Sequence, residues 1–493
     1  MARSLGGIVL NEDWRSVYDP EEFRRQGHRL IDLLADYWER SLSGAATDPV
    51  LPWQDPQEAV EFWTQMQERP GTLVELVEQV LARSVAVLHP RYLGHQIAVP
   101  TPLSALASLV VDCLNNGCGV YEMGMVGAAM ERIACAQLAL RVGFPATAGG
   151  FLTGGGTLAN LTALLAARAR HVEEVWERGT TESLTVLVSD QAHYSIDRAV
   201  RVMGWGASGI TRVPVDEKFC LRTDMLGEAY REARSAGRRP IAVVGTAATT
   251  ATGAVDDLAA IADFCRKHEL WFHVDAAHGG AMVFSRRHRP RLEGIEQADS
   301  VVIDFHKMLM TPALASALIF RRHEDSRRTF STHAEYLFDS AAQAPRCDDF
   351  DTGRRTFECT KSMMAVKVFV NLALHGWEVL EANVDRLLEM AQRFADMIES
   401  HPRFELATRP QSNIVCFRFT GVLPAHRDQC NALIRQRLVT GGSFYIVQTR
   451  LAGELWLRCT ITNPLTSPHH FRQLLAELDR LAAAVHLDAS HMA

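Results

Sequence analysis

Two residues in this chain have the types and spacing needed for one particular chemistry. Lys307 ends an apolar run at residues 300–307 (SVVIDFHK), and Asp275 lies in another run at residues 270–280 (LWFHVDAAHGG). A lysine amine condenses with an aldehyde, and a carboxylate beside a pyridine nitrogen keeps that nitrogen protonated. Neighbouring strand ends would present both groups to one ligand. The pair therefore predicts a site for pyridoxal 5′-phosphate (PLP).

A glycine-rich turn lies upstream of this pair. Residues 151–170 (FLTGGGTLANLTALLAARAR) predict a turn that leads into a long helix. Free backbone N–H groups at a helix start, together with the Thr157 hydroxyl, suit an anion such as a phosphate. The segment matches neither a Walker loop nor the dinucleotide-binding GxGxxG pattern. By itself it is equally compatible with an ordinary helix start.

Polar side chains follow two further predicted strands. His193 comes just after residues 185–190 (TVLVSD), and Thr249 and Thr250 end residues 241–249 (IAVVGTAAT). An imidazole could stack on a cofactor ring and touch a substrate carboxylate, and a hydroxyl could bond the ring oxygen or the phosphate. The simpler interpretation, structural side chains in turns, stays open for each. Ala277 lies on the same side of its strand as Asp275, and its small side chain would let a ring lie flat.

The order of elements explains why these residues should meet. From about residue 100 to 380, β-rich runs alternate with helical segments such as residues 257–268, which predicts a mostly parallel sheet covered on both faces. Ligands of such sheets bind at the carboxyl ends of the strands. We expect a helical arm at residues 1–100, a large PLP-binding domain at 101–385 and a small C-terminal α+β domain at 386–489. The helices predicted at residues 20–39 and 72–81 could pack on another subunit or on their own domain.

Bulk properties narrow the class of protein. The chain has 493 residues, 47% hydrophobic and 22% charged, which excludes a disordered or fibrous protein. A formal charge of −7 without a long basic block argues against nucleic acid as a partner. No apolar run reaches the eighteen or so residues of a membrane span. Ten scattered cysteines with no CxxC pair and no metal-ligand spacing predict reduced thiols in the cytoplasm and no metal site.

These motifs together resemble the group II PLP-dependent amino acid decarboxylases, which include the glutamate, cysteine sulfinate, aromatic amino acid and 2,4-diaminobutyrate enzymes. The resemblance is carried by HVDAAHGG and DFHK at their spacing, by SDQAHYS and GTAATT upstream, and by FRRQGHRLIDLLADYW, HPRYLGHQ and LRCTITNP elsewhere. It covers nearly the whole chain. It implies a PLP-dependent transferase-like (fold type I) large domain with a seven-stranded sheet, and a homodimer with a shared active site.

The resemblance also implies a role for each matching residue. Lys307 would form the internal aldimine with PLP, Asp275 would pair with the pyridine nitrogen, and His193 would stack on the ring. Tyr336, in HAEYL, matches a mobile-loop tyrosine that protonates the quinonoid carbanion after CO2 leaves. The remaining matches are cofactor-binding Gly156, Thr157, Thr250 (with Thr249 as its neighbour), Ala277 and His306, and substrate-binding His95 and Arg458.

Three segments depart from the family pattern. Asp304-Phe305 stands where many relatives have Asn-Pro, and the diaminobutyrate branch is closer to the present form. Thr360-Lys361 stands where many relatives have Gly-Arg. Gly94-His95-Gln96 replaces the Asn-Gln of glutamate-type relatives, and residues 121–127 (YEMGMVG) match no single substrate class. The substrate therefore stays open among acidic, diamino and aromatic amino acids.

The expected activity is decarboxylation of an L-amino acid to its amine and CO2. Two other PLP-dependent activities are alternatives to decarboxylation. An oxidative, decarboxylative aldehyde synthase is disfavoured because the loop tyrosine, Tyr336, is present, and an aminotransferase is weaker still. A binding protein on the same fold would be expected to lack Lys307, Asp275 or His193. A hydrolase of the α/β class is disfavoured because no GxSxG elbow occurs.

Overall fold

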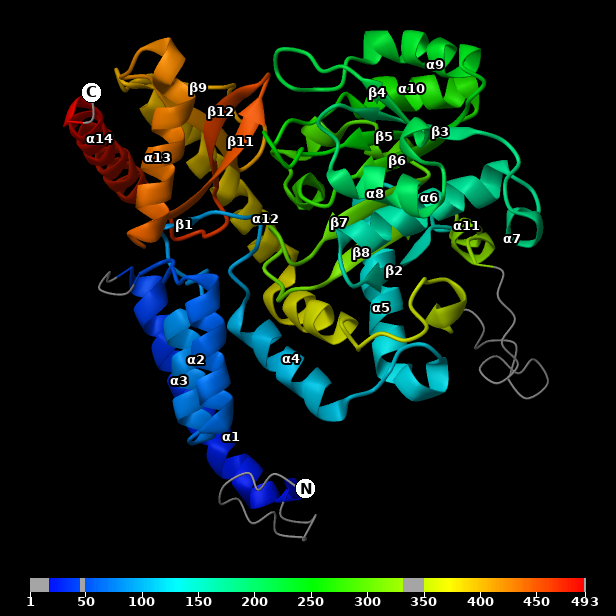
Figure 1. The fold of residues 1–493 in the computed structure, drawn as a ribbon. Coiled ribbons are helices and arrows are strands. Elements are labelled where there is room, and N and C mark those ends of the chain that lie inside the picture. The colour runs from blue at the N-terminus through cyan, green and yellow to red at the C-terminus, as the bar shows by residue number, and fades with distance from the viewer. Residues whose placement is uncertain (1–16, 45–48, 331–349, 492–493) are drawn as a thin grey trace, which may run out of the picture.

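The structure is a computed structural model, and it describes residues 17–44, 49–330 and 350–491. In these residues the chain forms a helical arm, a large sheet covered by helices, and a smaller sheet with its own helices (Figure 1). The α-helices are α1 (Pro20–Ser43), α2 (Pro56–Glu68), α3 (Leu73–Arg83), α4 (Pro102–Leu114), α5 (Tyr121–Val142), α6 (Gly156–His171), α7 (Val175–Arg178), α8 (Tyr194–Val202), α9 (Leu226–Ser235), α10 (Leu258–His268), α11 (His323–Arg328), α12 (Ala365–Glu399), α13 (Arg427–Thr440) and α14 (Pro468–His491).

The large sheet has seven strands in the order β2-β8-β7-β6-β5-β3-β4. Its strands are β2 (Gly149–Thr153), β3 (Leu184–Ser189), β4 (Ile210–Val213), β5 (Arg239–Thr246), β6 (Trp271–Asp275), β7 (Ser300–Asp304) and β8 (Ser316–Phe320). Five neighbouring strands, β7 to β4, pair in parallel, and β8 is antiparallel to both of its neighbours. The prediction of a mostly parallel, seven-stranded sheet is therefore confirmed.

Both faces of this sheet are buried, as its nearly continuous apolar strands require. Successive residues of a strand enter opposite cores: Phe151 and Val186 pack with α6 and α8, whereas Leu152 and Leu187 pack with α5, α10 and α12. The parallel strands β3, β5, β6 and β7 end side by side, so the side chains that follow them gather at one edge of the sheet.

The smaller sheet has five strands in the order β1-β11-β12-β10-β9. These are β1 (Tyr92–Leu93), β9 (Phe404–Leu406), β10 (Ile414–Phe419), β11 (Tyr445–Leu451) and β12 (Glu454–Thr460), and α13 and α14 pack beside them. The strand β1 comes from the range that the sequence assigned to the arm, and it pairs in parallel with β11. The chain just after the arm is thereby anchored to the small sheet.

The arm consists of α1, α2 and α3 and projects from the rest of the molecule (Figure 1). Its sequence sets the helix starts. Asp19 caps α1 ahead of Pro20, and Thr72 and Glu75 form a reciprocal capping box at α3. The helices predicted at residues 20–39 and 72–81 are present, and α2 was not predicted.

Two element boundaries differ from expectation. The helix α12 begins at Ala365 and therefore runs across the domain boundary predicted at residue 385; it is interrupted at Gly376, where φ is +74°. The strand predicted to close at Lys307 ends at Asp304, because the chain turns there and places Lys307 beside the strand end. Among the described residues no helix combines the length and the hydrophobicity needed to cross a bilayer.

Candidate active site

A cavity of about 280 Å³ opens at the carboxyl ends of β5, β6 and β7. It is lined by Gly154, Gly155, Gly156, Thr157, Asn160, His193, Thr246, Ala248, Thr250, Asp275, Ala277, His278, Asp304, His306, Lys307 and Leu314. All eight residues that the sequence suggested for a cofactor lie in this lining. The strand-end rule for parallel sheets explains why they meet although they span some 150 residues of chain.

Asp275, the last residue of β6, is a buried carboxylate at the base of this cavity. Its Oδ2 accepts a hydrogen bond from the Asn160 amide at 2.9 Å, and its Oδ1 accepts one from the backbone N–H of Ala277 at 3.2 Å. A buried carboxylate needs such donors to stay ionised. Its oxygens keep further lone pairs, so Asp275 can also receive a protonated ring nitrogen from the cavity.

His193 caps the start of α8 and lines the cavity. Its Nδ1 lies 2.8 Å from the Ser195 hydroxyl and accepts the Ser195 backbone N–H at 3.4 Å. Burial lowers the pKa of His193 below its usual value; Lys307 and Arg198 act in the same sense, and Asp275 and Asp304 oppose it. The imidazole is therefore neutral at neutral pH.

Lys307 lies in the turn after β7 and pairs with Asp304. Its Nζ is 2.9 Å from Asp304 Oδ2, and His306 Nε2 is 3.6 Å from the same oxygen. Burial by itself would raise the pKa of the Asp304 carboxyl, but the charges of Lys307 and His306 and the Ser316 hydroxyl outweigh it and hold this pKa below its usual value. The residue that departs from the family pattern is thus a carboxylate paired with the reactive amine.

The start of α6 forms an anion cradle at one end of the cavity. Gly155 has φ +131°, a conformation that side chains rarely adopt, and the first turn of α6 has no side-chain cap. Its free N–H groups and the Thr157 hydroxyl suit a phosphate. Thr246 Oγ1, also in the lining, is buried and has no hydrogen-bond partner among the described residues, and such an atom calls for a ligand or a water.

Arg458, in β12, approaches the cavity from the small sheet. It is 6% exposed, its guanidinium donates to the backbone oxygen of Thr250 at 2.6 Å, and its Nε has no partner. Burial lowers its pKa, but a guanidinium stays protonated in proteins. In the part of the chain that the structure describes, no carboxylate pairs with it. A buried cation without a counter-ion is a site for an anionic ligand.

His95 lies near Arg458, and both residues lie outside the lining of the cavity. Its ring is 5.9 Å from that of Tyr445, and burial, together with the charges of Arg458 and Arg435, lowers its pKa. The pairing of β1 with β11 brings it there. The two residues suggested for substrate are therefore neighbours at the side of the cavity that faces the small sheet.

Thr249 and Thr250 have different environments. The Thr249 hydroxyl is fully buried, bonds the Thr252 hydroxyl at 2.8 Å and accepts the N–H of Ala254, so it stabilises the turn. Thr250 lines the cavity. Of these two threonines, Thr250 is the one placed to meet a ligand.

The other departures from the family pattern lie away from the cavity. Lys361 is buried in an ion pair with Glu131 at 2.7 Å and donates to the backbone oxygen of Leu152, so it supports the packing of α5 against β2. The segment 121–127 forms the start of α5, and none of its residues lines the cavity. Tyr336 lies outside the described residues.

Three polar side chains of the lining were not singled out from the sequence: Asn160, Thr246 and His278. Burial, reinforced by Lys307 and Arg458, lowers the pKa of His278 to about 3, and its Nε2 lies 2.6 Å from Asn413 Oδ1. Asn160 stands inside the apolar helix run LANLTALL. A polar residue within such a run is a usable signal, because a buried amide must have partners.

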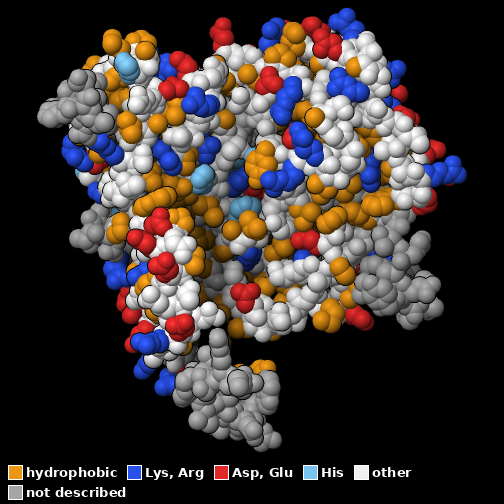
Figure 2. Space-filling model, in the orientation of Figure 1, with side chains coloured by type: hydrophobic (Ala, Val, Ile, Leu, Met, Phe, Trp, Pro, Cys, Tyr) orange, Lys and Arg blue, Asp and Glu red, His pale blue; other side chains and the backbone are white. Residues whose placement is uncertain are grey.

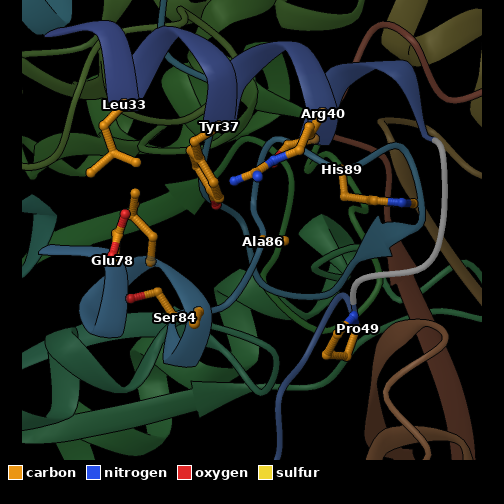
Figure 3. Close-up of a pocket in the computed structure, with 11 residues that line it drawn as sticks. Leu33, Tyr37, Arg40, Pro49, Glu78, Ser84, Ala86 and His89 are labelled. Atoms are coloured by element: carbon orange, nitrogen blue, oxygen red, sulfur yellow. The ribbon is translucent and has the colours of Figure 1, made fainter. Parts of the chain in front are cut away.

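A larger cavity of about 490 Å³ lies in the arm, between α1, α3 and residues 84–89 (Figure 3). Tyr37, Arg40, Glu78 and His89 line it together with small and aliphatic side chains. None of its lining residues is a lysine, so it offers no amine for carbonyl chemistry. The chemistry-bearing residues are concentrated in the smaller cavity at the sheet edge.

Comparison with known proteins identifies the family. The model of the pyridoxal-dependent decarboxylase conserved domain matches residues 56–420. The chain belongs to this family. It is 27% identical to an aromatic-L-amino-acid decarboxylase of Bacillus atrophaeus (94% of this chain, 96% of the relative) and 30% identical to the cysteine sulfinic acid decarboxylase of Mus musculus (89% and 92%). The crystal structure of mouse CSAD in apo form superimposes with a TM-score of 0.87 at 26% identity, over 94% of this chain and 99% of that one.

This protein is therefore a PLP-dependent amino acid decarboxylase of fold type I, a carboxy-lyase. The predictions of family, reaction and cofactor are confirmed. The cavity also fits the cofactor by its own chemistry: it combines an uncapped glycine-rich helix start, a buried carboxylate, a lysine amine and an unpartnered threonine hydroxyl. The assignment of single residues to roles is a separate question.

Proposed function

We propose that this enzyme decarboxylates a free L-amino acid in the cavity lined by Lys307, Asp275 and His193. The supporting observation is that the Lys307 amine and the Asp275 carboxylate line one cavity together with an uncapped helix start. When bound there, PLP supplies an electron sink for the carbanion that remains after CO2 leaves. Gly156, Thr157 and the start of α6 would hold its phosphate.

The residues of the chain have distinct tasks in this proposal. Asp275 is the carboxylate for the ring nitrogen, and hydrogen bonds from the Asn160 amide and the Ala277 N–H hold it in place. Lys307 is the reactive amine, and Asp304 is the base within reach of its ammonium proton. His193, Thr250, Ala277 and His306 line the space for the cofactor.

Arg458 is the proposed anchor for a substrate carboxylate. Its buried, unpaired guanidinium offers the charge and the planar fork that a carboxylate needs. His95 lies near Arg458, and its lowered pKa keeps the imidazole neutral. The ring can therefore form a hydrogen bond to the substrate while Arg458 provides the positive charge for the carboxylate. The substrate would thus bridge the large sheet, with Lys307, and the small sheet, with Arg458.

The decisive experiment is a substrate panel. The holoenzyme is incubated with each of the twenty amino acids, with 2,4-diaminobutyrate and with cysteine sulfinate, and released CO2 and amine are measured. Lys307→Ala is expected to abolish turnover, and borohydride treatment of the wild type is expected to add the cofactor's mass to Lys307. Turnover by Lys307→Ala would sink the proposal. Stoichiometric ammonia and peroxide in place of the amine would instead indicate an aldehyde synthase.

Tyr336 is the proposed proton donor to the substrate Cα, on the basis of its match in the sequence. Tyr336→Phe removes only the phenolic hydroxyl. We expect CO2 release to persist while the yield of amine per CO2 falls and aldehyde rises, because the carbanion then waits longer for a proton. An unchanged ratio of amine to CO2 would assign the protonation to another group.

We also propose that the enzyme is a homodimer with a shared active site. The side chains of Leu103, Leu106, Leu109, Val110 and Leu114 are 40–56% exposed along α4, and those of Met123, Met125 and Val126 are exposed at the start of α5. Figure 2 shows further hydrophobic side chains where the arm meets the rest of the molecule. Contiguous apolar surface of this kind marks a protein interface.

The dimer can be tested by disrupting that surface. Leu106→Glu with Val110→Glu should shift the molecular mass measured by light scattering from dimer to monomer and abolish activity. Leu423→Glu is the matched control, because Leu423 is 71% exposed and lies outside the α4 and α5 surface. A wild type that is monomeric and active would contradict the proposal.

Two further proposals concern the location of the enzyme in the cell and its division into domains. We propose a cytoplasmic location, supported by nine described cysteines, none of which forms a disulfide. We also keep the division into a large domain at residues 101–385 and a small domain at 386–489, which the two separate sheets support. Limited proteolysis of the holoenzyme would test the division, and fractionation of the native cells would test the location.

A further inference from the structure

Behind the cavity, buried polar side chains form one continuous hydrogen-bonded chain. Trp271 Nε1 donates to Ser300 Oγ at 2.9 Å, and Ser300 Oγ lies 2.8 Å from His273 Nδ1. His273 Nε2 lies 3.0 Å from Asn160 Oδ1. Asn160 Nδ2 reaches both Asp275 Oδ2 and Ser195 Oγ at 2.9 Å. Trp271, His273 and Asp275 are alternate residues of β6 and lie on one face of the sheet, so the chain runs along that face to the cavity wall.

The direction of every hydrogen bond follows from Asp275. An ionised carboxylate only accepts, so the Asn160 atom beside it must be the amide nitrogen, and Asn160 Oδ1 must face His273. His273 Nε2 therefore carries the proton. Burial lowers the pKa of His273 to about 4, so the neutral ring has a bare Nδ1, which accepts the Ser300 hydroxyl. The Ser300 oxygen in turn accepts the indole N–H of Trp271.

The second amide proton of Asn160 determines a second branch of hydrogen bonds, which runs through Ser195 to His193. It is donated to Ser195 Oγ, so the Ser195 hydroxyl proton is free to point to His193 Nδ1, 2.8 Å away. The same Nδ1 accepts the backbone N–H of Ser195. Two donors at Nδ1 leave no room for a proton there. A neutral His193 must then carry its proton on Nε2.

We propose that Asn160 is a positioning residue that sets both groups at once: its amide fixes the Asp275 carboxylate and, through Ser195, holds His193 as the Nε2–H tautomer. His193 thereby meets a ligand as a hydrogen-bond donor, which suits a substrate carboxylate, and it cannot act as a base at that nitrogen. The inference deepens the proposed function and rests on it, and it adds Asn160, Ser195, His273 and Ser300 to the residues that shape the site.

The wild type tests the tautomer directly. Protein labelled with ring-15N histidine is examined by two-dimensional 1H–15N NMR, and His193→Gln assigns the His193 signals. We expect a bare Nδ1 and a protonated Nε2 near neutral pH. A protonated Nδ1 would overturn the inference without the need for any variant, and the measurement requires no catalytic activity. Its failure is therefore distinguishable from a failure of the proposed decarboxylation.

Variants separate the two branches. Ser195→Ala removes the donor to His193 and leaves the bond from Asn160 to Asp275 in place, so we expect the PLP dissociation constant to stay within about twofold. Without that donor the His193 cation forms at higher pH, while Asp275, Asp304, Lys307 and Arg198 still surround the ring. The acid limb of the kcat/KM profile should move up by about half a unit or more. Ser195→Thr keeps the hydroxyl and should restore the profile.

Asn160→Ala removes both branches. We expect PLP to bind about 10- to 100-fold more weakly, the range for a lost hydrogen bond to a charged group, and the acid limb to move as in Ser195→Ala. Thr185→Val is the matched control, because it deletes a buried hydroxyl pair with Thr211 in the same sheet, 2.9 Å apart and away from the cavity. It should lower thermal stability only. Unchanged PLP binding in Asn160→Ala, or a shifted pH profile in Thr185→Val, would overturn the inference.

Discussion

Arg458 offers a test in which stability and function are expected to change in opposite directions. The guanidinium is 6% exposed and, in the described residues, has a backbone oxygen as its partner and no carboxylate. An uncompensated buried charge costs about 3–5 kcal/mol. Arg458→Met removes this charge, keeps the aliphatic part of the side chain and gives up one charge-assisted hydrogen bond of about 1.5–3 kcal/mol. The ligand-free protein should gain about 1–3 kcal/mol.

The gain is measurable as a melting temperature. With about 2 cal/mol/K of unfolding entropy per residue, 493 residues correspond to about 1 kcal/mol/K, so the cofactor-free variant should melt about 1–3 °C higher. Substrate binding should suffer, because truncating one partner of a buried charge pair costs at least about 2 kcal/mol, or about 30-fold in KM. Scanning calorimetry and steady-state kinetics give the two numbers.

Arg418 provides the matched control. It lies in β10 of the same sheet and is 7% exposed, but it pairs with Glu405 and Glu454 and lies over the ring of Trp456. Arg418→Met should lower the melting temperature and leave KM unchanged. If Arg458→Met were destabilised as Arg418→Met is, or if its KM equalled that of the wild type, the assignment of Arg458 as an unpaired anion anchor would be wrong.

Three further predictions concern charge. Asp304→Asn removes a carboxylate that lies close to the start of α6 and pairs with Lys307. Because this carboxylate would repel the phosphate of PLP, the variant should bind PLP about tenfold more tightly in an equilibrium titration of the cofactor-free protein. Weaker binding would refute a repulsion between Asp304 and the phosphate. Glu131→Gln leaves Lys361 buried without its counter-ion. The melting temperature should therefore fall by about 3–5 °C while KM stays unchanged. An unaltered melting temperature would contradict a stabilising role of this ion pair. His273 and His278 have pKa values lowered to about 4 and about 3. Between pH 6.5 and 4 the unfolded chain therefore binds more protons than the folded one, and stability falls as pH falls. His278→Asn should make the melting temperature less dependent on pH between 7.5 and 5, and the same slope as in the wild type would count against this.

The residues at strand ends could be predicted from the sequence because one physical rule places them. Parallel strands end at one edge, so a lysine and an aspartate after two buried strands must come close, whatever the rest of the chain does. Arg458 and His95 were found by resemblance alone. Their proximity depends on β1, a strand of two residues that pairs with β11, and a pattern that short carries no periodic signal.

The polar chain behind the cavity could have been suspected from its burial pattern. Asn160 interrupts an apolar helix and His273 interrupts the apolar strand LWFHVD, and both are completely or almost completely buried. A buried amide and a buried imidazole are retained only if their hydrogen bonds are made. What the sequence lacks is the identity of the partners. Ser195 and Ser300 are separated from Asn160 by 35 and 140 residues, and only the folded sheet brings them together.

The same chain explains why one amide can matter at two positions. Asn160 has two N–H donors on one amide nitrogen and one acceptor oxygen, all oriented by fixed neighbours, so a change at its oxygen is felt at both partners of its nitrogen. An aspartate at this position would put a second carboxylate against Asp275, and one of the two would have to be protonated. An alanine would leave Asp275 with the N–H of Ala277 as its remaining backbone donor. Asparagine is the residue that satisfies His273, Ser195 and Asp275 together while adding no charge to the site.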